Sequence, residues 1–238
     1  MSAVLYSVAE SVATLTLNRP ESRNALNLEM CDGLINACKK FSSDGSVKIV
    51  VVRANGSVFC AGADLKERQG MGEAQVRERR MKGFAAYAAL EALPMPVIAA
   101  VQGPVVGSGC EIAGACDFII ATPEASFRTP EALRGTVGAT QRLPRILGKR
   151  LAKDMMFTGR TLSAEEAREA GLVSRVVSDL ELTLQEISKI ILNAPPESLR
   201  LAKRCIDRGV ELDPKGALDT EIAAIEEQLA AGSWMGKK

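Results

Sequence analysis

The sequence contains no histidine among its 238 residues, and this absence removes several kinds of catalytic site. Enzymes that pair a serine or cysteine nucleophile with histidine are excluded, as are the common zinc sites. Acid–base chemistry near neutral pH must therefore use carboxylates, lysine, cysteine or tyrosine, and there are only 2 tyrosines. Carboxyl groups whose surroundings raise their pKa become the leading candidates, and we expect no metal at the site.

The sequence also lacks the features that direct proteins to membranes, nucleic acids or oxidising compartments. No apolar run reaches the roughly 18 residues that a membrane-spanning helix needs, and residues 1–17 do not resemble a signal peptide. The net charge of +1 gives no reason to expect nucleic acid or a membrane as a partner. The 6 cysteines show no C-x-x-C spacing, so reduced, buried thiols in a cytoplasmic protein are the simplest interpretation.

What is present is an alternation of strand and helix patterns. Runs typical of strands occupy residues 12–17, 48–53, 97–101, 117–121 and 173–177. Apolar residues at helical spacing mark residues 28–41, 84–93 and 110–116, and a capping box at 163–166 begins another helix. This order predicts an α/β fold with mostly parallel strands.

The C-terminal part of the sequence is helical. Beyond residue 182, three helical patterns are separated at 195–196 and 213–214, and the last carries an apolar stripe formed by Leu218, Ile222, Ile225 and Leu229. We predict an α/β core at residues 1–185 and a helical region at 186–238 that serves packing or assembly.

Two loops of small residues, 59–65 and 103–111, each follow a predicted strand. Small residues let the backbone approach a ligand, and two such loops could direct two N–H groups at one oxygen, which is an oxyanion hole. Packing or phosphate binding would explain the same spacing. Cys60 and Cys110 lie in these loops, where we expect them to pack rather than to act as nucleophiles.

Two carboxylates stand out near these loops. Glu111 lies within an apolar helix, where it either acts chemically or is the buried partner of an arginine. Glu131 lies at a predicted helix start, where it either acts chemically or stabilises the helix N-terminus. The basic run at 77–82 predicts a solvated helix face, with steering of a phosphate-bearing ligand as the alternative.

Several motifs in a fixed order carry a resemblance to a known family. They are N-R-P at 18–20, R-N-A-L-N at 23–27, F-C-A-G-A-D-L at 59–65, G-S-G-C-E at 107–111, P-E at 130–131 and T-Q-R-L-P at 140–144. With the later F-T-G-R at 157–160 and A-R-E-A-G-L-V at 167–173, the chain resembles the crotonase (enoyl-CoA hydratase/isomerase) family over roughly residues 10–230.

The resemblance implies a crotonase-like spiral of β-β-α units with a helical C-terminal trimerisation region, forming a homotrimer or a hexamer of two trimers. Ala63 and Ser108 would supply the oxyanion-hole N–H groups, and Glu111 and Glu131 match the two glutamates of the hydratases. The coenzyme A part of an acyl-CoA substrate would lie near Arg23, Ala25, Leu26, Ala61, Asp64 and Leu65. The implied reaction is hydration of a 2-enoyl-CoA, with no cofactor beyond the coenzyme A of the substrate.

The sequence departs from the family pattern in four places. Ser108 replaces a usual glycine, and Arg128 replaces another, where we expect it to pair with Glu131 and lower its pKa. The 135–140 loop is shorter than usual, and the chain stops at 234–238 without most of the usual last helix. Two alternatives to a hydratase therefore stay open: a double-bond isomerase, which needs one carboxylate, and a non-catalytic binding or assembly protein of the same fold.

Overall fold

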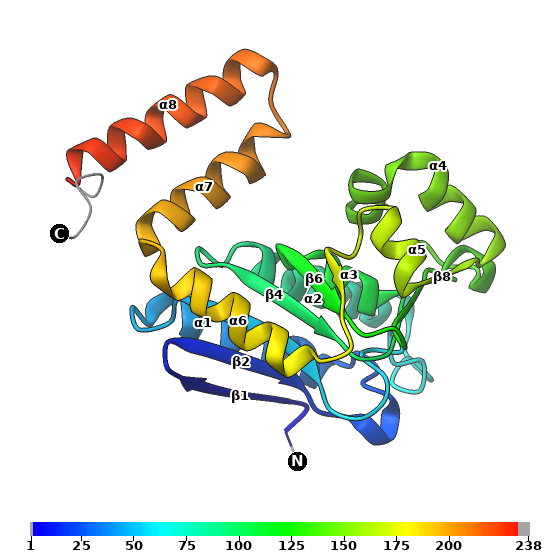
Figure 1. Cartoon of the computed structure of the whole chain (residues 1–238). Helices are drawn as coiled ribbons and strands as arrows, with labels where there is room; N and C mark the ends of the chain where they lie inside the picture. The colour runs from blue at the N-terminus through cyan, green and yellow to red at the C-terminus, as the bar shows by residue number, and fades with distance from the viewer. Residues whose placement is uncertain (1, 233–238) are drawn as a thin grey trace.

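The computed structural model describes residues 2–232, which form two sheets covered by helices (Figure 1). The larger sheet has six strands in the order β1 (Val4–Ala9), β2 (Val12–Leu17), β3 (Ile49–Ala54), β4 (Val97–Val101), β6 (Phe118–Ala121) and β9 (Arg175–Val176). β1 is antiparallel to β2, and every other pairing in this sheet is parallel. The predicted α/β class with mostly parallel strands is confirmed.

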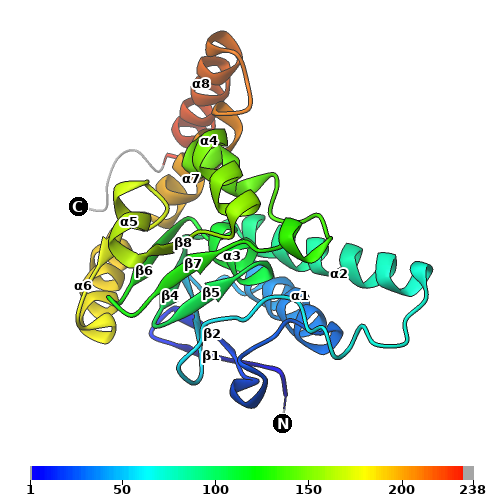
Figure 2. The same ribbon diagram turned by 90° about the vertical axis from the view of Figure 1, so that its right-hand side faces the viewer.

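The smaller sheet contains β5 (Pro104–Val106), β7 (Ser126–Arg128) and β8 (Thr161–Ser163). Each of its first two strands directly follows a strand of the larger sheet and leads towards a helix. β4 and β5 precede α3 (Ser108–Gly114), and β6 and β7 precede α4 (Arg142–Thr158). This repetition is the β-β-α spiral that the resemblance implies, and it brings the starts of α3 and α4 to one side of the molecule (Figure 2).

Alternate residues of the central strands enter two different cores. Val50 and Val52 of β3 pack into the larger core, with α1 (Leu28–Ser43) and α2 (Glu73–Glu91) on that side. Ile49 and Val51 face the other way and pack with Leu184 and Ile187 of α6 (Leu180–Asn193). β3 is thus buried on both faces, which explains its unbroken β-branched sequence.

The last two helices leave the body of the protein. α7 (Pro196–Gly209) and α8 (Pro214–Ala230) pack against each other and project away from the sheets in both views (Figures 1 and 2). The predicted stripe on α8 is exposed: Leu218, Ile222, Ile225 and Leu229 are 56%, 44%, 47% and 51% accessible. The proposed boundary at 185/186 falls inside α6 and stays a prediction, and 234–238 lie outside the described residues.

Several elements differ from the sequence-based expectation, among them β5, which lies within the loop predicted at 103–111. α2 begins at Glu73 rather than near 84, because its first half is helical without the apolar spacing that marks a helix in a sequence. The patterns do not predict β1, whose residues after Val4 are exposed. Nor do they predict α4, which is interrupted at Gly148. The remaining short helices are η1 (Pro20–Ser22), η2 (Ala132–Arg134) and α5 (Ala164–Glu169).

A buried asparagine fixes the connection between β2 and α1. Asn24 has a positive φ of 52° and is fully buried. Its amide donates 2.8 Å hydrogen bonds to the carbonyls of Asn55 and Val58, and its side-chain oxygen accepts a 2.8 Å bond from the N–H of Arg19. Two segments that are distant in sequence, 19–24 and 55–58, are therefore tied together by one side chain.

We expect Asn24→Ala to lower the free energy of unfolding by about 3 kcal/mol, because it orphans buried backbone groups and leaves alanine in a left-handed conformation. Urea denaturation monitored by circular dichroism measures the change. Asn193→Ala, at the exposed end of α6, is the matched control and should change stability by less than about 0.5 kcal/mol. Equal effects of the two substitutions would contradict a structural role for the Asn24 amide.

Candidate active site

Six of the predicted site residues line one pocket of about 920 Å³: Ala61, Ala63, Leu65, Ser108, Glu111 and Glu131. The pocket lies between the loop after β3, the first half of α2, the start of α3 and the segment that contains η2. The structure therefore brings both predicted carboxylates and both predicted oxyanion-hole residues to the same cavity.

The other four predicted residues lie beside this pocket and do not line it. Arg23, Ala25, Leu26 and Asp64 belong to two segments joined by backbone hydrogen bonds, from Leu26 N–H to the Gly62 carbonyl at 2.8 Å and from Asp64 N–H to the Leu26 carbonyl at 2.9 Å. Arg23 is exposed, and its carbonyl accepts a bond from the Ala61 N–H at 3.0 Å. The segment at 23–26 is thus the neighbour of the first loop.

The Asp64 carboxylate has a structural part in this neighbourhood. One oxygen accepts a 2.8 Å bond from Arg19, and the other accepts bonds from the N–H groups of Lys66 and Glu67. Burial alone would raise the pKa of Asp64, but these hydrogen bonds outweigh it and hold that pKa below its usual value.

The two loops of small residues touch each other through their backbones. The Val106 N–H donates to the Cys60 carbonyl at 2.9 Å. A Cβ placed on Gly62 would lie 3.9 Å from the backbone nitrogen of Ser108. Within residues 2–232, neither the Ala63 N–H nor the Ser108 N–H donates to a backbone carbonyl. Two amide donors on adjoining loops are therefore left for a ligand in the pocket.

Glu111 is held by an arginine from α4. The carboxylate is buried, and its Oε2 accepts a 2.7 Å hydrogen bond from Nη1 of Arg142. The other end of the same guanidinium pairs with Glu91 at 2.7 Å, and its carbon lies 5.8 Å from the ring centre of Tyr87. The pairing with an arginine is the alternative that the sequence left open, and it occurs on the pocket wall, where it holds the carboxylate in place.

Glu131 has the opposite environment. Its Oε2 is buried without a hydrogen-bond partner in the described residues. Burial raises the pKa of this carboxyl, the negative charge of Glu111 raises it further, and Arg134 and Arg80 only partly oppose this. Gly107, at φ 53°, lies directly against the carboxylate. A Cβ there would lie 2.3 Å from Oε1 of Glu131. A side chain at 107 would displace the acid.

Arg128 does not behave as expected. Its Nε donates to the Gly159 carbonyl at 2.9 Å, and no ion pair joins it to Glu131 in the described part of the chain. The prediction that it lowers the pKa of Glu131 is wrong, because β7 pairs with β8 and directs the guanidinium towards the turn before β8.

The basic run at 77–82 is only partly a solvated face. Arg79 is buried, pairs with Glu67 at 2.6 Å and donates to the Leu26 carbonyl. Arg80 reaches across the pocket rim to Thr136 and to the Val137 carbonyl. Period and composition alone did not distinguish these inward residues from the exposed Arg77.

The two cysteines beside the loops are buried packing residues, as predicted. Burial raises the pKa of the Cys60 thiol to about 12 and raises that of Cys110 still further, so neither is a thiolate near neutral pH. All 6 cysteines are free.

Two residues beside the pocket, Arg142 and Tyr87, were not predicted from the sequence. Arg142 belongs to the T-Q-R-L-P motif, but no local pattern identifies Glu111 as its partner. Tyr87 on α2 is buried, and burial raises its pKa, while a hydrogen bond with the Ser108 side chain opposes that rise. The scarcity of tyrosine was the only signal that could have drawn attention to it.

Comparisons with known proteins identify the family to which the chain belongs. The family model described as enoyl-CoA hydratase/isomerase matches residues 7–233. The chain belongs to the enoyl-CoA hydratase/isomerase (crotonase) family. It is 37% identical to the short-chain-enoyl-CoA hydratase of Clostridium acetobutylicum over 233 residues, covering 95% of this chain and 89% of that protein. It is also 37% identical to the enoyl-CoA isomerase/hydratase fer4 of Mycosarcoma maydis over 248 residues, covering 96% and 90%.

A solved crotonase structure superimposes closely. The crystal structure of the enoyl-CoA hydratase from Bacillus anthracis has a TM-score of 0.91 at 38% identity and covers 94% of this chain and 90% of that one. Within 2–232, this crotonase has no helix that is both long and apolar enough to cross a bilayer. The same residues contain no cluster of three or more acidic or cysteine side chains suited to a metal ion.

The burial of Glu131 predicts a measurable dependence of stability on pH. Because the folded-state pKa lies above the ordinary 4.5, this carboxyl stabilises the fold below pH 4.5 relative to higher pH, and that contribution is lost as the pH rises through the raised pKa. We expect Glu131→Gln to become progressively more stable than the wild type between pH 4.5 and neutrality. Thermal denaturation of both proteins at several pH values measures this difference. The exposed Glu186→Gln should show a constant difference, and a flat profile for Glu131→Gln would contradict the burial argument.

Proposed function

We propose that this crotonase hydrates a 2-enoyl-CoA thioester to the 3-hydroxyacyl-CoA. The observation that carries the proposal is that Glu111 and Glu131 line the same pocket as the residues with two uncommitted amide donors, Ala63 and Ser108. Names of relatives that include short-chain-enoyl-CoA hydratase support the substrate class.

The two amides act on the thioester carbonyl. When the N–H groups of Ala63 and Ser108 both bind that oxygen, electron density is drawn from the conjugated double bond and Cβ becomes electrophilic. Attack at Cβ moves negative charge onto the same oxygen, and the two donors stabilise the resulting enolate. Removing one donor of such a pair typically costs about 100-fold or more in rate.

The two glutamates divide the proton transfers. Glu111, held by Arg142 at 2.7 Å, accepts one proton of a water molecule while the water oxygen bonds to Cβ. Glu131, whose pKa is raised by burial, gives its proton to Cα as the enolate collapses. One water is consumed, and its proton passes from Glu111 to solvent while Glu131 is reprotonated. No electrons are exchanged with a cofactor, so the reaction needs only the coenzyme A of the substrate.

The coenzyme A portion of the substrate then extends towards the segment at 23–26. Ala61 lies on the pocket wall, and its N–H is bonded to the Arg23 carbonyl, so it joins the pocket to this segment. The exposed Arg23 guanidinium is free to approach a phosphate from solvent.

A double-bond isomerase is the second candidate. It is favoured by the tight hold of Arg142 on Glu111, since an isomerase can move one proton with a single carboxylate, here Glu131. The name of the fer4 relative includes both activities. The two candidates differ in whether Glu111 is needed.

Replacement of each glutamate tests this division. We expect Glu111→Gln and Glu131→Gln each to lower the kcat for crotonyl-CoA hydration by about 100-fold or more, because each removes one proton transfer. Loss of the conjugated thioester absorbance measures the rate, and circular dichroism checks the fold. Glu73→Gln, exposed at the start of α2, is the control and should keep the wild-type rate.

The outcomes separate the candidates. Hydration that survives Glu111→Gln at the wild-type rate would contradict the proposed mechanism. Loss of hydration with retained isomerisation of a 3-enoyl-CoA in the same variant would favour the isomerase. A wild-type protein that turns over neither substrate would indicate a non-catalytic binding protein.

We also propose that the projecting helices mediate assembly into a homotrimer or a hexamer of two trimers. The apolar side chains of α8 are about half exposed, although such a stripe is stable in water only when something covers it. α7 is anchored near its middle, where Lys203 pairs with Asp117 at 2.9 Å, so the helix is held to the body of the protein at that point.

Interruption of the stripe should break the assembly. We expect Ile222→Glu, or removal of residues 214–238, to convert a trimer or hexamer into smaller species and to lower activity with it. Multi-angle light scattering at micromolar concentration measures the mass. Glu221→Gln, on the neighbouring exposed position, should leave the mass unchanged. An active, monodisperse wild-type monomer would contradict the assembly proposal.

A further inference from the structure

The walls of the active-site pocket carry an excess of positive charge. Six ionisable residues line it: the arginines Arg68, Arg79, Arg80 and Arg134 and the glutamates Glu111 and Glu131. Two of them are neutralised by partners outside the lining, since Arg79 pairs with Glu67 and Glu111 with Arg142. Three guanidinium groups then face one carboxyl, Glu131, whose burial favours its neutral form.

Of these three arginines, Arg68 has the strongest need for a hydrogen-bond acceptor. It lies in the loop between β3 and α2 and is half-buried, and its Nε is buried with no hydrogen-bond partner in the described residues. Burying an N–H of a charged group without an acceptor costs more free energy than burying a neutral N–H in the same way. A ligand that brings an acceptor to this atom would remove that cost.

Arg80 and Arg134 complete the charged wall. Arg80 bonds only to neutral oxygens, those of Thr136 and Val137. The side chain of Arg134, on η2, makes no ion pair or hydrogen bond in residues 2–232, although its charge acts on Glu131. Neither arginine is offset by a carboxylate of its own, and both come from elements that close the pocket around the reacting groups.

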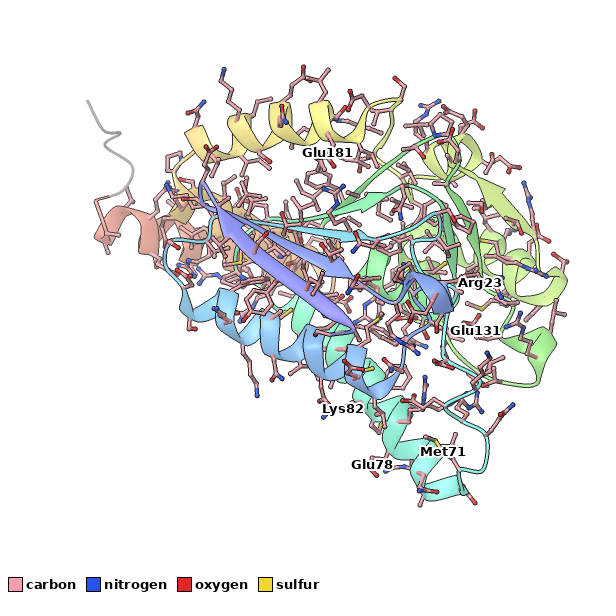
Figure 3. The ribbon with its side chains drawn as sticks, turned by 90° about the horizontal axis from the view of Figure 1, so that it is seen from below. Arg23, Met71, Glu78, Lys82, Glu131 and Glu181 are labelled. Atoms are coloured by element: carbon pink, nitrogen blue, oxygen red, sulfur yellow. The ribbon has the colours of Figure 1, made fainter. Side chains whose placement is uncertain are left out.

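Arg68 belongs to a part of the pocket lining that is separate from the segment proposed for coenzyme A. Met71, which lines the pocket with Arg68, is well separated from Arg23 in the view from below (Figure 3). Arg79, which does reach the 23–26 segment through the Leu26 carbonyl, is the arginine already paired with Glu67. The unpaired charge of Arg68 is therefore apart from the 23–26 segment, in the direction in which an acyl chain would extend.

We infer that the acyl group of the substrate carries a carboxylate at its far end and that Arg68 and Arg134 bind it. This inference rests on the proposed position of the thioester carbonyl between Ala63 and Ser108. A planar carboxylate can accept paired N–H bonds from a guanidinium, which a methyl-terminated chain cannot do. Apolar side chains beside the arginines, such as Phe84 and Val137, would contact the methylene groups between the two ends.

Binding of unreactive, saturated acyl-CoA ligands tests the inference independently of catalysis. Calorimetry would compare glutaryl-CoA with pentanoyl-CoA, adipyl-CoA with hexanoyl-CoA, and suberyl-CoA with octanoyl-CoA. We expect the dicarboxylic member of at least one pair to bind about tenfold or more tightly, because charged hydrogen bonds replace contacts of a methyl group. No preference in any pair would overturn the inference.

Two variants locate the preference. Arg68→Met and Arg134→Met keep the length of the side chain without its charge, and each should reduce the dicarboxylate preference towards unity while leaving the monocarboxylic ligand unaffected. Arg77→Met, exposed on α2 and outside the pocket lining, should keep the full preference. An equal loss of affinity for both members of a pair in Arg68→Met would assign the guanidinium to the phosphates of coenzyme A and overturn the inference.

The same ligands separate this inference from the proposed function. Because they cannot be hydrated, a dicarboxylate preference without turnover of any enoyl-CoA would overturn the proposed hydration and leave the charge recognition standing. Turnover of crotonyl-CoA without a dicarboxylate preference would do the reverse.

Discussion

The site depends on how closely two backbone segments, 57–64 and 103–109, approach each other. A Cβ on Gly109 would lie 2.7 Å from the Cys60 carbonyl oxygen, so only glycine allows the contact. The approach is held by a hydrogen bond of 3.1 Å from the Phe59 N–H to the Pro104 carbonyl and by the bond between Val106 and Cys60. Because no side chain separates the segments, the amides of Ala63 and Ser108 within them come to the same cavity.

Beside these amides, the two carboxylates of the pocket differ in what surrounds them. Glu111 and Glu131 are the same residue type on the same pocket, yet one has a partly buried guanidinium at 2.7 Å and the other has a buried oxygen with no partner in the described residues. A fold without histidine can therefore hold two carboxyl groups of one pocket in different environments. The distinction is created by α4 and by the turn before η2.

The sequence was informative where a local pattern has one structural meaning. The strands at 12–17 and 97–101 were predicted with their bounds, because β-branched runs and alternation are local properties. The glutamates and the two loops were predicted because ordered motifs mark them. The pairing of Glu111 with Arg142 could not be predicted, since 31 residues separate them and either could have found another partner. The predictions for Arg128 and Arg79 were wrong for the same reason, because the contacts of the one and the burial of the other depend on tertiary neighbours.

The ties that build the site join segments in the order in which they are synthesised. Leu26 pairs with Ala63, Cys60 with Val105, the Gly107 N–H with the Arg128 carbonyl, and finally Glu111 with Arg142. A nascent chain that has reached residue 111 holds an acidic group within an apolar helix before its counter-ion exists. At translation rates of roughly 5–20 residues per second, the intervening residues take between about 2 and about 6 seconds to appear. Until Arg142 has been made, the helix that carries Glu111 has no cation to bury the carboxylate against, so this part of the core closes only after the start of α4 is available.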